Sequence, residues 1–206
     1  MSLFDGFRKK KDDKSEVKQK AIETNTESEG YYFENPLELA IYGKLFAKDK
    51  TVRWLSGDNY VVEFQKGYQF FEQGLYGKSI EAYKKSLEFN PIGLSARFEI
   101  CEAYLAMGNF PAARNTLLEM KDFLIEEKCI ARFYRRMGYI EIEEENYKVA
   151  AACYQYSRKF EAHPSVAQEL MYIMSKAGKG VASNNPEKIL SRANLPLLST
   201  KTLNDL

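Results

Sequence analysis

Hydrophobic and polar positions repeat along this chain from about residue 59 onward, and the repeat unit is long. Comparison of the chain with itself at an offset of about 34 residues pairs positions of the same kind. The pairs are Gly67 with Cys101, Phe70 with Tyr104, Gly74 with Gly108, Tyr76 with Phe110, Ser79 with Ala113, and Tyr83 with Leu117. The pattern predicts two consecutive pairs of antiparallel helices.

A third copy of the unit follows at an offset of about 37 residues. The residues matched in this step are Cys101 with Gly138, Phe110 with Tyr147, Ala113 with Ala150, and Leu117 with Tyr154. The longer step implies a short insertion between Leu117 and Tyr134. We therefore expect three helical hairpins in a row.

Small residues at fixed places explain why the unit repeats. Gly67, Cys101 and Gly138 allow the second helix of each unit to approach the first. Gly74 and Gly108 are placed to end the first helix of their units, because glycine favours the left-handed backbone found there. A large side chain at Gly138 should hold the two helices apart.

These residues resemble the tetratricopeptide repeat, a family whose signature has the form W-x-x-L-G-x-x-Y, A-x-x-x-F, P. The first copy carries Gly67-x-x-Phe70, Ser79-x-x-x-Tyr83 and Pro91. The resemblance covers residues 60 to 164. The departures from the signature are Glu63, Lys66, Arg97 and Glu141, each at a place where the family has a larger apolar residue.

The resemblance implies an all-α superhelix of three helical hairpins, with an N-terminal helix and a C-terminal capping helix. The expected divisions are a disordered charged tail at 1–30, an N-terminal helical segment at 31–58, repeats at 60–93, 94–130 and 131–164, a capping helix at 165–180, and a C-terminal helix and tail at 181–206. We expect a turn or short helix at 51–59, and Trp54 covering one end of the core. Ser165 is the expected N-cap of the capping helix. Leu195, Leu197 and Leu198 belong to a loosely held tail or dock on the groove of the protein itself.

Composition narrows the class of protein. The chain has 206 residues and a net charge of +1, which disfavours nucleic acid as a partner. The 3 cysteines show no CxxC spacing, so we expect no disulfide framework or zinc site and a cytoplasmic location. We expect neither a transmembrane helix nor a secretory signal. Leu3, Phe4 and Phe7 ahead of basic residues allow weak contact of the tail with a membrane surface.

The chain offers little for catalysis. The only histidine, His163, precedes a proline, and Cys101, Cys129 and Cys153 have no histidine at helical spacing. No phosphate-binding glycine motif is present in the sequence, and we expect the glutamates at 141–145 to form a solvated helix face. We therefore expect no enzyme activity, no cofactor and no metal.

The resemblance places the first helix of each unit on a concave binding face. The residues expected there are Phe64, Tyr68, Phe71, Phe98, Glu102, Leu105, Arg132, Arg135, Arg136 and Tyr139. Arg132 and Arg136 share one helix face, and they either bind an anionic group of a partner or pair with Glu99 and Glu102. Some family members hold the acidic C-terminus of heat-shock chaperones, but Phe64, Tyr68 and Glu99 do not supply that clamp.

The predicted function is binding of a protein or peptide as an adaptor or scaffold. Two alternatives stay open. One is a dedicated cytosolic chaperone or secretion adaptor for a client protein, and the other is a regulatory subunit of an enzyme complex. The fold by itself does not choose between them.

Overall fold

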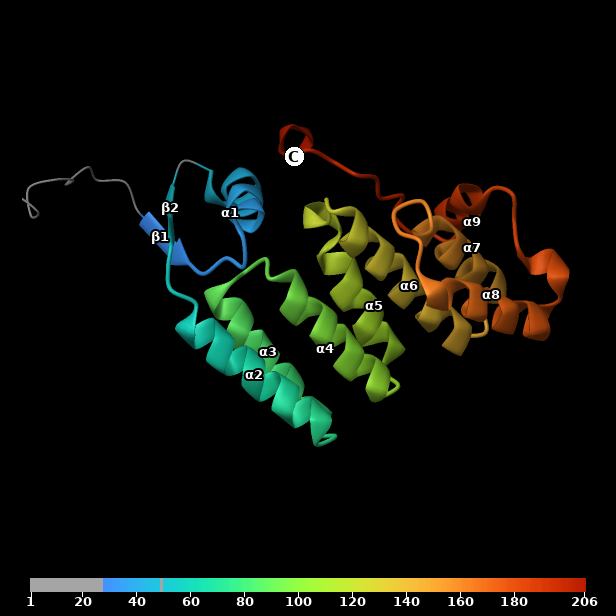
Figure 1. Cartoon of the computed structure of the whole chain (residues 1–206), viewed down its shortest axis with the longest axis horizontal. Coiled ribbons are helices and arrows are strands. Elements are labelled where there is room, and N and C mark those ends of the chain that lie inside the picture. The colour runs from blue at the N-terminus through green and yellow to red at the C-terminus, as the bar shows by residue number, and fades with distance from the viewer. Residues whose placement is uncertain (1–27, 49) are drawn as a thin grey trace, which may run out of the picture.

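The computed structural model describes residues 28–48 and 50–206. Helices dominate this part of the chain, and three antiparallel hairpins stand side by side (Figure 1). The hairpins are α2 (Asp58–Glu72) with α3 (Tyr76–Phe89), α4 (Leu94–Ala106) with α5 (Phe110–Glu119), and α6 (Glu127–Glu143) with α7 (Tyr147–Ser157). The arrangement confirms the predicted all-α solenoid of three hairpins.

The turns inside the hairpins repeat the two sequence offsets. In each turn, a backbone N–H just past the first helix donates to a carbonyl near the end of that helix. These bonds join Leu75 to Phe70 at 2.9 Å, Asn109 to Tyr104 at 2.9 Å, and Asn146 to Glu141 at 2.8 Å. The residue before each donor has a positive φ, which is 70° at Gly74, 68° at Gly108 and 60° at Glu145. The acceptors are spaced as the sequence offsets predict.

The small residue Gly67 sets the distance between α2 and α3. A Cβ atom at Gly67 would lie 2.7 Å from the ring of Tyr83, closer than side chains pack. Beside it, the Ser79 hydroxyl donates a hydrogen bond of 2.8 Å to the Gly67 carbonyl. The second helix therefore lies directly on the backbone of the first.

The N-terminal segment contains two strands that the sequence did not predict. Strand β1 (Ser28–Tyr31) pairs in parallel with β2 (Thr51–Trp54), and α1 (Pro36–Tyr42) with the π-helical turn Gly43–Ala47 connects them. The expectation of a turn or short helix at 51–59 is therefore wrong for β2. Its β-branched residues and Trp54 favour a strand once a partner strand is available.

Trp54 does not cover the core as expected. Its side chain is 46% exposed, and its ring meets the Phe33 ring edge-on at 6.4 Å between centroids. Phe33 is fully buried and takes the interior place. Residues 1–27 of the predicted tail (1–30), with its membrane contact, lie outside the described residues, whereas residues 28–30 belong to β1.

A buried polar network docks the N-terminal segment on the first two hairpins. The Glu38 carboxylate accepts hydrogen bonds from the Asn90 side chain at 2.8 Å and from the Glu34 backbone N–H at 2.7 Å. The Glu34 carboxylate accepts from Ser95 at 2.9 Å and from the Tyr60 hydroxyl. These bonds fix the segment to the helices that follow it.

Helix α8 (Pro164–Ala177) covers the apolar face of the last hairpin. Val166 and Ile173 of α8 are buried against Ala150 and Tyr154 of α7. Its N-cap is His163 rather than the predicted Ser165, because the extended backbone at His163 lets the Nδ1 atom accept the Ser165 N–H at 3.3 Å.

Helix α9 (Pro186–Arg192) lies within the region 181–206, where a C-terminal helix is predicted, and it packs against α7. Short 3-10 turns lie at Lys121–Phe123, Lys179–Val181 and Leu203–Asp205. After α9 the chain turns back across the helices towards the side of α1 (Figure 1). We call residues 195–206 the C-terminal strap. Its Leu195 and Leu198 are buried in the main core, so the prediction of a loosely held tail is wrong for them.

Candidate functional site

Within each of α2, α4 and α6, the predicted groove residues share one helix face, as their spacing requires. They differ widely in exposure. Tyr68 of α2 is the most open aromatic residue among them at 55% exposed, and Tyr139 of α6 is also exposed. Phe64, Phe71 and Leu105 are half-buried.

Two of the groove aromatics mainly hold α2 in place. The Phe64 ring meets the Tyr83 ring edge-on at 5.2 Å between centroids, and the Phe71 ring meets Tyr76 at 5.3 Å. Both partners belong to α3. Tyr68 is therefore the aromatic side chain on this helix that is free to meet a partner protein.

Phe98 belongs to the core rather than to the groove surface. Its side chain is 2% exposed, and the Arg132 guanidinium lies over its ring at 4.3 Å from the centroid. The expectation that Phe98 contacts a partner directly is therefore wrong. A cation over the face of a ring is attracted by the ring electrons, so Phe98 positions Arg132 instead.

The arginines of α6 pair with glutamates of neighbouring segments. Arg132 lies 3.1 Å from a carboxylate oxygen of Glu99 and 3.6 Å from one of Glu102. The Arg136 Nε atom also contacts Glu102. Arg135 pairs with Glu161 at 2.7 Å. Of the two alternatives for Arg132 and Arg136, pairing within the molecule is the one observed.

These arginines border a hollow between α6 and α8, which we call the arginine pocket. Its volume is about 280 Å³. The lining residues are Arg132, Arg135, Arg136, Tyr139, Tyr154, His163, Ser165 and Glu169. The structure thus gathers all the predicted α6 residues around one concavity.

Four lining residues of the arginine pocket were not predicted from the sequence. Tyr154 comes from α7 and reaches the pocket by crossing α6 at Gly138, where a Cβ atom would be 2.8 Å from its ring. The other three, His163, Ser165 and Glu169, come from the start of α8. The signal for Tyr154 was its match with Leu117 in the repeat alignment, whereas α8 gave none because it lies outside the repeats.

The electrostatics of the arginine pocket are mixed. The guanidinium groups of Arg132, Arg135 and Arg136 are balanced by the carboxylates of Glu99, Glu102, Glu161 and Glu169. Burial raises the pKa of the Glu169 carboxyl above its ordinary value. The His163 Nδ1 atom accepts the Ser165 N–H at 3.3 Å. The pocket therefore offers donors and acceptors together and holds no excess of positive charge.

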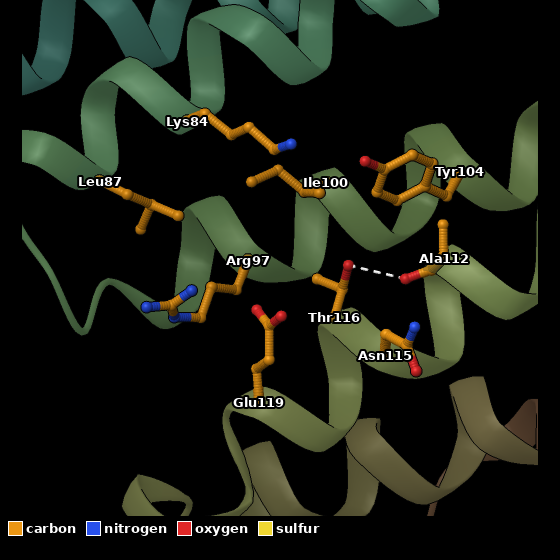
Figure 2. A pocket seen from close by; sticks show the side chains of 9 residues that line it. All are labelled: Lys84, Leu87, Arg97, Ile100, Tyr104, Ala112, Asn115, Thr116 and Glu119. Carbon is orange, nitrogen blue, oxygen red and sulfur yellow. Dashed lines mark hydrogen bonds between the residues drawn. The ribbon is translucent and has the colours of Figure 1, made fainter.

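A second hollow of about 290 Å³ lies between α3, α4 and α5, as Figure 2 shows. Its lining residues are Lys84, Leu87, Arg97, Ile100, Tyr104, Ala112, Asn115, Thr116 and Glu119. None of the predicted groove residues lines it. Arg97 donates to the Pro91 carbonyl at 2.6 Å, and burial lowers the pKa of its guanidinium. The sequence signal was Arg97 itself, one of the departures from the repeat signature.

The described residues offer poor catalytic groups. Burial raises the pKa of the Cys101 thiol to about 12 and that of Cys129 to about 11, and it raises the pKa of Cys153 as well. Thiols in such surroundings are weak nucleophiles. Within residues 28–48 and 50–206, no three metal-ligating side chains are gathered at one place. No helix in the described part of the chain is long and apolar enough to span a membrane.

The sequence matches no protein-family profile and no curated protein. Solved structures with a similar fold do exist. The first TPR domain of Spaghetti (RPAP3), bound to the HSP90 peptide SRMEEVD, has a TM-score of 0.51 and 20% identity, over 59% of this chain and 95% of that one. The first TPR domain of human RPAP3 has a TM-score of 0.50 and 20% identity, over 61% of this chain and 97% of that one. With its three hairpins and matching turns, this chain has the tetratricopeptide-repeat fold.

Proposed function

We propose that this chain is a protein- or peptide-binding adaptor that uses the face formed by α2, α4 and α6. The observation that carries the proposal is the arginine pocket, which opens beside exposed Tyr139 on the side of α6 that the repeat pattern assigns to the groove. We place the adaptor in the cytoplasm, because its three cysteines are free.

The size and chemistry of the arginine pocket suit part of a peptide. A volume of 280 Å³ is close to the lower end of ligand pockets, so it accommodates a side chain or a short stretch of backbone. Arginine and tyrosine are the residue types that contribute most to protein interfaces. Arg136 and Tyr139 provide both at one edge of the pocket, and Tyr68 adds a further aromatic on α2.

The ion pairs around Glu102 decide which peptides fit. An acidic ligand must compete with Glu99 and Glu102 for the guanidinium groups of α6, so a purely acidic peptide gains little. The similar RPAP3 domain was solved with the acidic peptide SRMEEVD. For this chain we favour a peptide of mixed charge over that ligand.

Two alternative roles use the same surface. A chaperone or secretion adaptor would bind extended apolar segments of many clients, whereas a regulatory subunit would bind one enzyme at a fixed ratio. A peptide array separates the first role from a single-partner adaptor, because only the chaperone would retain many unrelated apolar peptides. Copurification at constant stoichiometry would favour the single partner.

The test is affinity capture from a cell extract, followed by measurement of the dissociation constant for each captured protein. Tyr68→Ala and Arg136→Ala should each weaken a genuine groove partner by about 1 to 3 kcal/mol. Arg136→Glu should weaken it more, with a loss that depends on salt. Lys85→Ala, on the exposed side of α3, is the matched control and should leave affinity unchanged. Unaltered binding by all the groove variants would overturn the proposal.

A further inference from the structure

The C-terminal strap is held on the helices by hydrogen bonds to its backbone. After α9, the Leu195 N–H donates to the Leu190 carbonyl at 3.0 Å, and the strap then runs across α6 and α7 without regular secondary structure until Leu203. Two tyrosine hydroxyls hold it there. One belongs to Tyr134 of α6 and the other to Tyr156 of α7.

The hydroxyl of Tyr134 makes two hydrogen bonds to the strap backbone. It donates to the Pro196 carbonyl at 2.6 Å and accepts the Leu198 N–H at 2.8 Å. The Tyr156 hydroxyl donates to the Leu198 carbonyl at 2.9 Å. Bonds to main-chain groups are available to any peptide in the same extended conformation, as in strand-addition recognition of peptides.

The side chains beneath these hydroxyls form an aromatic cradle, which we define as Tyr134, Tyr156 and Phe160. The Tyr134 and Tyr156 rings meet edge-on at 4.7 Å, and Phe160 stacks on Tyr134 at 6.3 Å between centroids. Ring packing thus holds the two tyrosine side chains in place beneath the strap.

Side chains of the strap alternate between buried and open positions. Leu195 and Leu198 are buried in the main core, whereas Leu197 between them is 47% exposed. Buried leucines supply affinity and specificity, and an exposed one supplies neither. The strap therefore presents the pattern Leu-Pro-x-Leu, in which the third side chain faces solvent.

Two features make the strap separable from the helices that it covers. Its backbone in the segment 196–198 is held by side-chain hydroxyls rather than by a ladder of backbone bonds. Its next residues, Ser199 and Thr200, are exposed. Residues 195–202 lie outside any helix or strand, and such irregular segments open at lower free energy than the helices of the core.

We propose that the aromatic cradle is a second peptide-binding site, occupied within the chain by the C-terminal strap, and that its partner is a protein segment with the extended sequence pattern Leu-Pro-x-Leu. This site goes beyond the groove function, because it uses residues on a different side of α6 from the arginine pocket. The strap acts as a built-in competitor for the external peptide.

The test measures binding of a fluorescently labelled peptide with the sequence of residues 194–206 to the full-length chain. In the double variant Leu195→Ser/Leu198→Ser the strap's own anchors are removed, and the peptide should bind about tenfold more tightly than to the unaltered chain. Adding Tyr134→Phe to the double variant should weaken peptide binding about tenfold, because the ring remains while both hydrogen bonds to the peptide backbone are lost.

Peptide variants provide the matched control. Replacing the residue equivalent to Leu198 by serine should abolish binding to the double variant, whereas the same change at the exposed Leu197 should leave the affinity unchanged. Equal losses in both peptides, or no binding to a double variant with native circular dichroism, would overturn the proposal. Dimers of the unaltered chain that exchange straps would also overturn it, because the occupant would then be a second copy.

If the double variant does not fold, hydrogen exchange of the unaltered chain decides the question. The Leu198 amide should exchange through a local opening, much faster than the amide of Ile140 in α6. Equal protection of both amides would mean that the strap leaves only when the protein unfolds, and the proposal would fail.

Discussion

Tyr154 crosses α6 directly over Gly138, where a Cβ atom would lie 2.8 Å from the tyrosine Cε2 atom. Tyr83 crosses α2 over Gly67 in the same way in the first hairpin. In the third hairpin this close approach carries the tyrosine side chain through to the arginine pocket. A packing rule of the repeat therefore also shapes the candidate site.

Gly138→Ala should lower the free energy of unfolding by about 1 to 3 kcal/mol, because the new methyl group must displace the Tyr154 ring. Gly138→Leu should lower it further. The measurement is urea unfolding followed by circular dichroism. Gly77→Ala in α3 is the matched control, since nothing lies within 4 Å of its added Cβ, and helix propensity predicts a gain of up to about 1 kcal/mol there. Similar effects of the two alanines would contradict the close-packing argument.

Stability should depend on pH through Glu38. Burial, the largest cause, raises the pKa of this carboxyl above its ordinary value of 4.5, although the bonds from Glu34 and Asn90 oppose the shift. A raised pKa in the folded state means that the stabilisation is complete below the ordinary value and is lost as the pH rises through the folded value. Glu38→Gln should therefore flatten this part of the pH profile, as urea unfolding between about pH 4 and 8 would measure. An unchanged slope would show that other groups cause it.

Glu102 should lower the affinity of the chain for acidic ligands. It contacts both Arg132 and Arg136, so Glu102→Gln removes the ion pair of Arg136 and leaves Arg132 paired with Glu99 alone. The peptide SRMEEVD, bound to the similar RPAP3 domain, is a suitable probe. Its affinity should rise by about tenfold in the variant, and the gain should shrink with added salt. Glu81→Gln on the exposed side of α3 serves as the control, and a gain in both variants would point to net charge alone.

Two N-terminal truncations should distinguish the contribution of residues 1–27 to thermal stability from that of strand β1. Removing residues 1–27 should leave the melting temperature nearly unchanged, because their charged composition offers little core. Removing residues 1–31 should lower it by several degrees, since β1 is lost along with the bond of 3.0 Å from the Tyr42 hydroxyl to Glu29. Differential scanning calorimetry compares the two chains. An equal melting temperature would mean that β1 contributes nothing to stability.

The repeats were predictable because their signal is local. Gly74 and Gly108 mark turns that any chain with this helical pattern must make, and the aligned small residues report contacts between helices close in sequence. The same reasoning identified the α6 arginines. It left their partners open, since a charge on a helix face does not show whether the opposite charge belongs to the same chain.

The remaining features depend on contacts between distant parts of the chain. A segment as short as Thr51–Trp54 becomes a strand only when Ser28–Tyr31 pairs with it. His163 caps α8 because its backbone is extended. By residue type alone, Ser165 would be an equally good N-cap. Leu195 and Leu197 look alike in sequence, and only docking on α6 and α7 separates the buried residue from the exposed one.

The end of the C-terminal strap has a consequence for how the chain folds. Leu203 and Leu206 pack against the same core as Phe33, and the Asp205 carboxylate lies within electrostatic range of Lys44. Repeat arrays ordinarily assemble through neighbouring units, so their contacts are local and quickly made. Here the first and last described segments meet. Bringing them together closes a loop that includes all three hairpins, and the entropic cost of this closure slows the step. The strap should therefore be the last part of the molecule to fold, and it should dock only after all three hairpins of the solenoid have assembled.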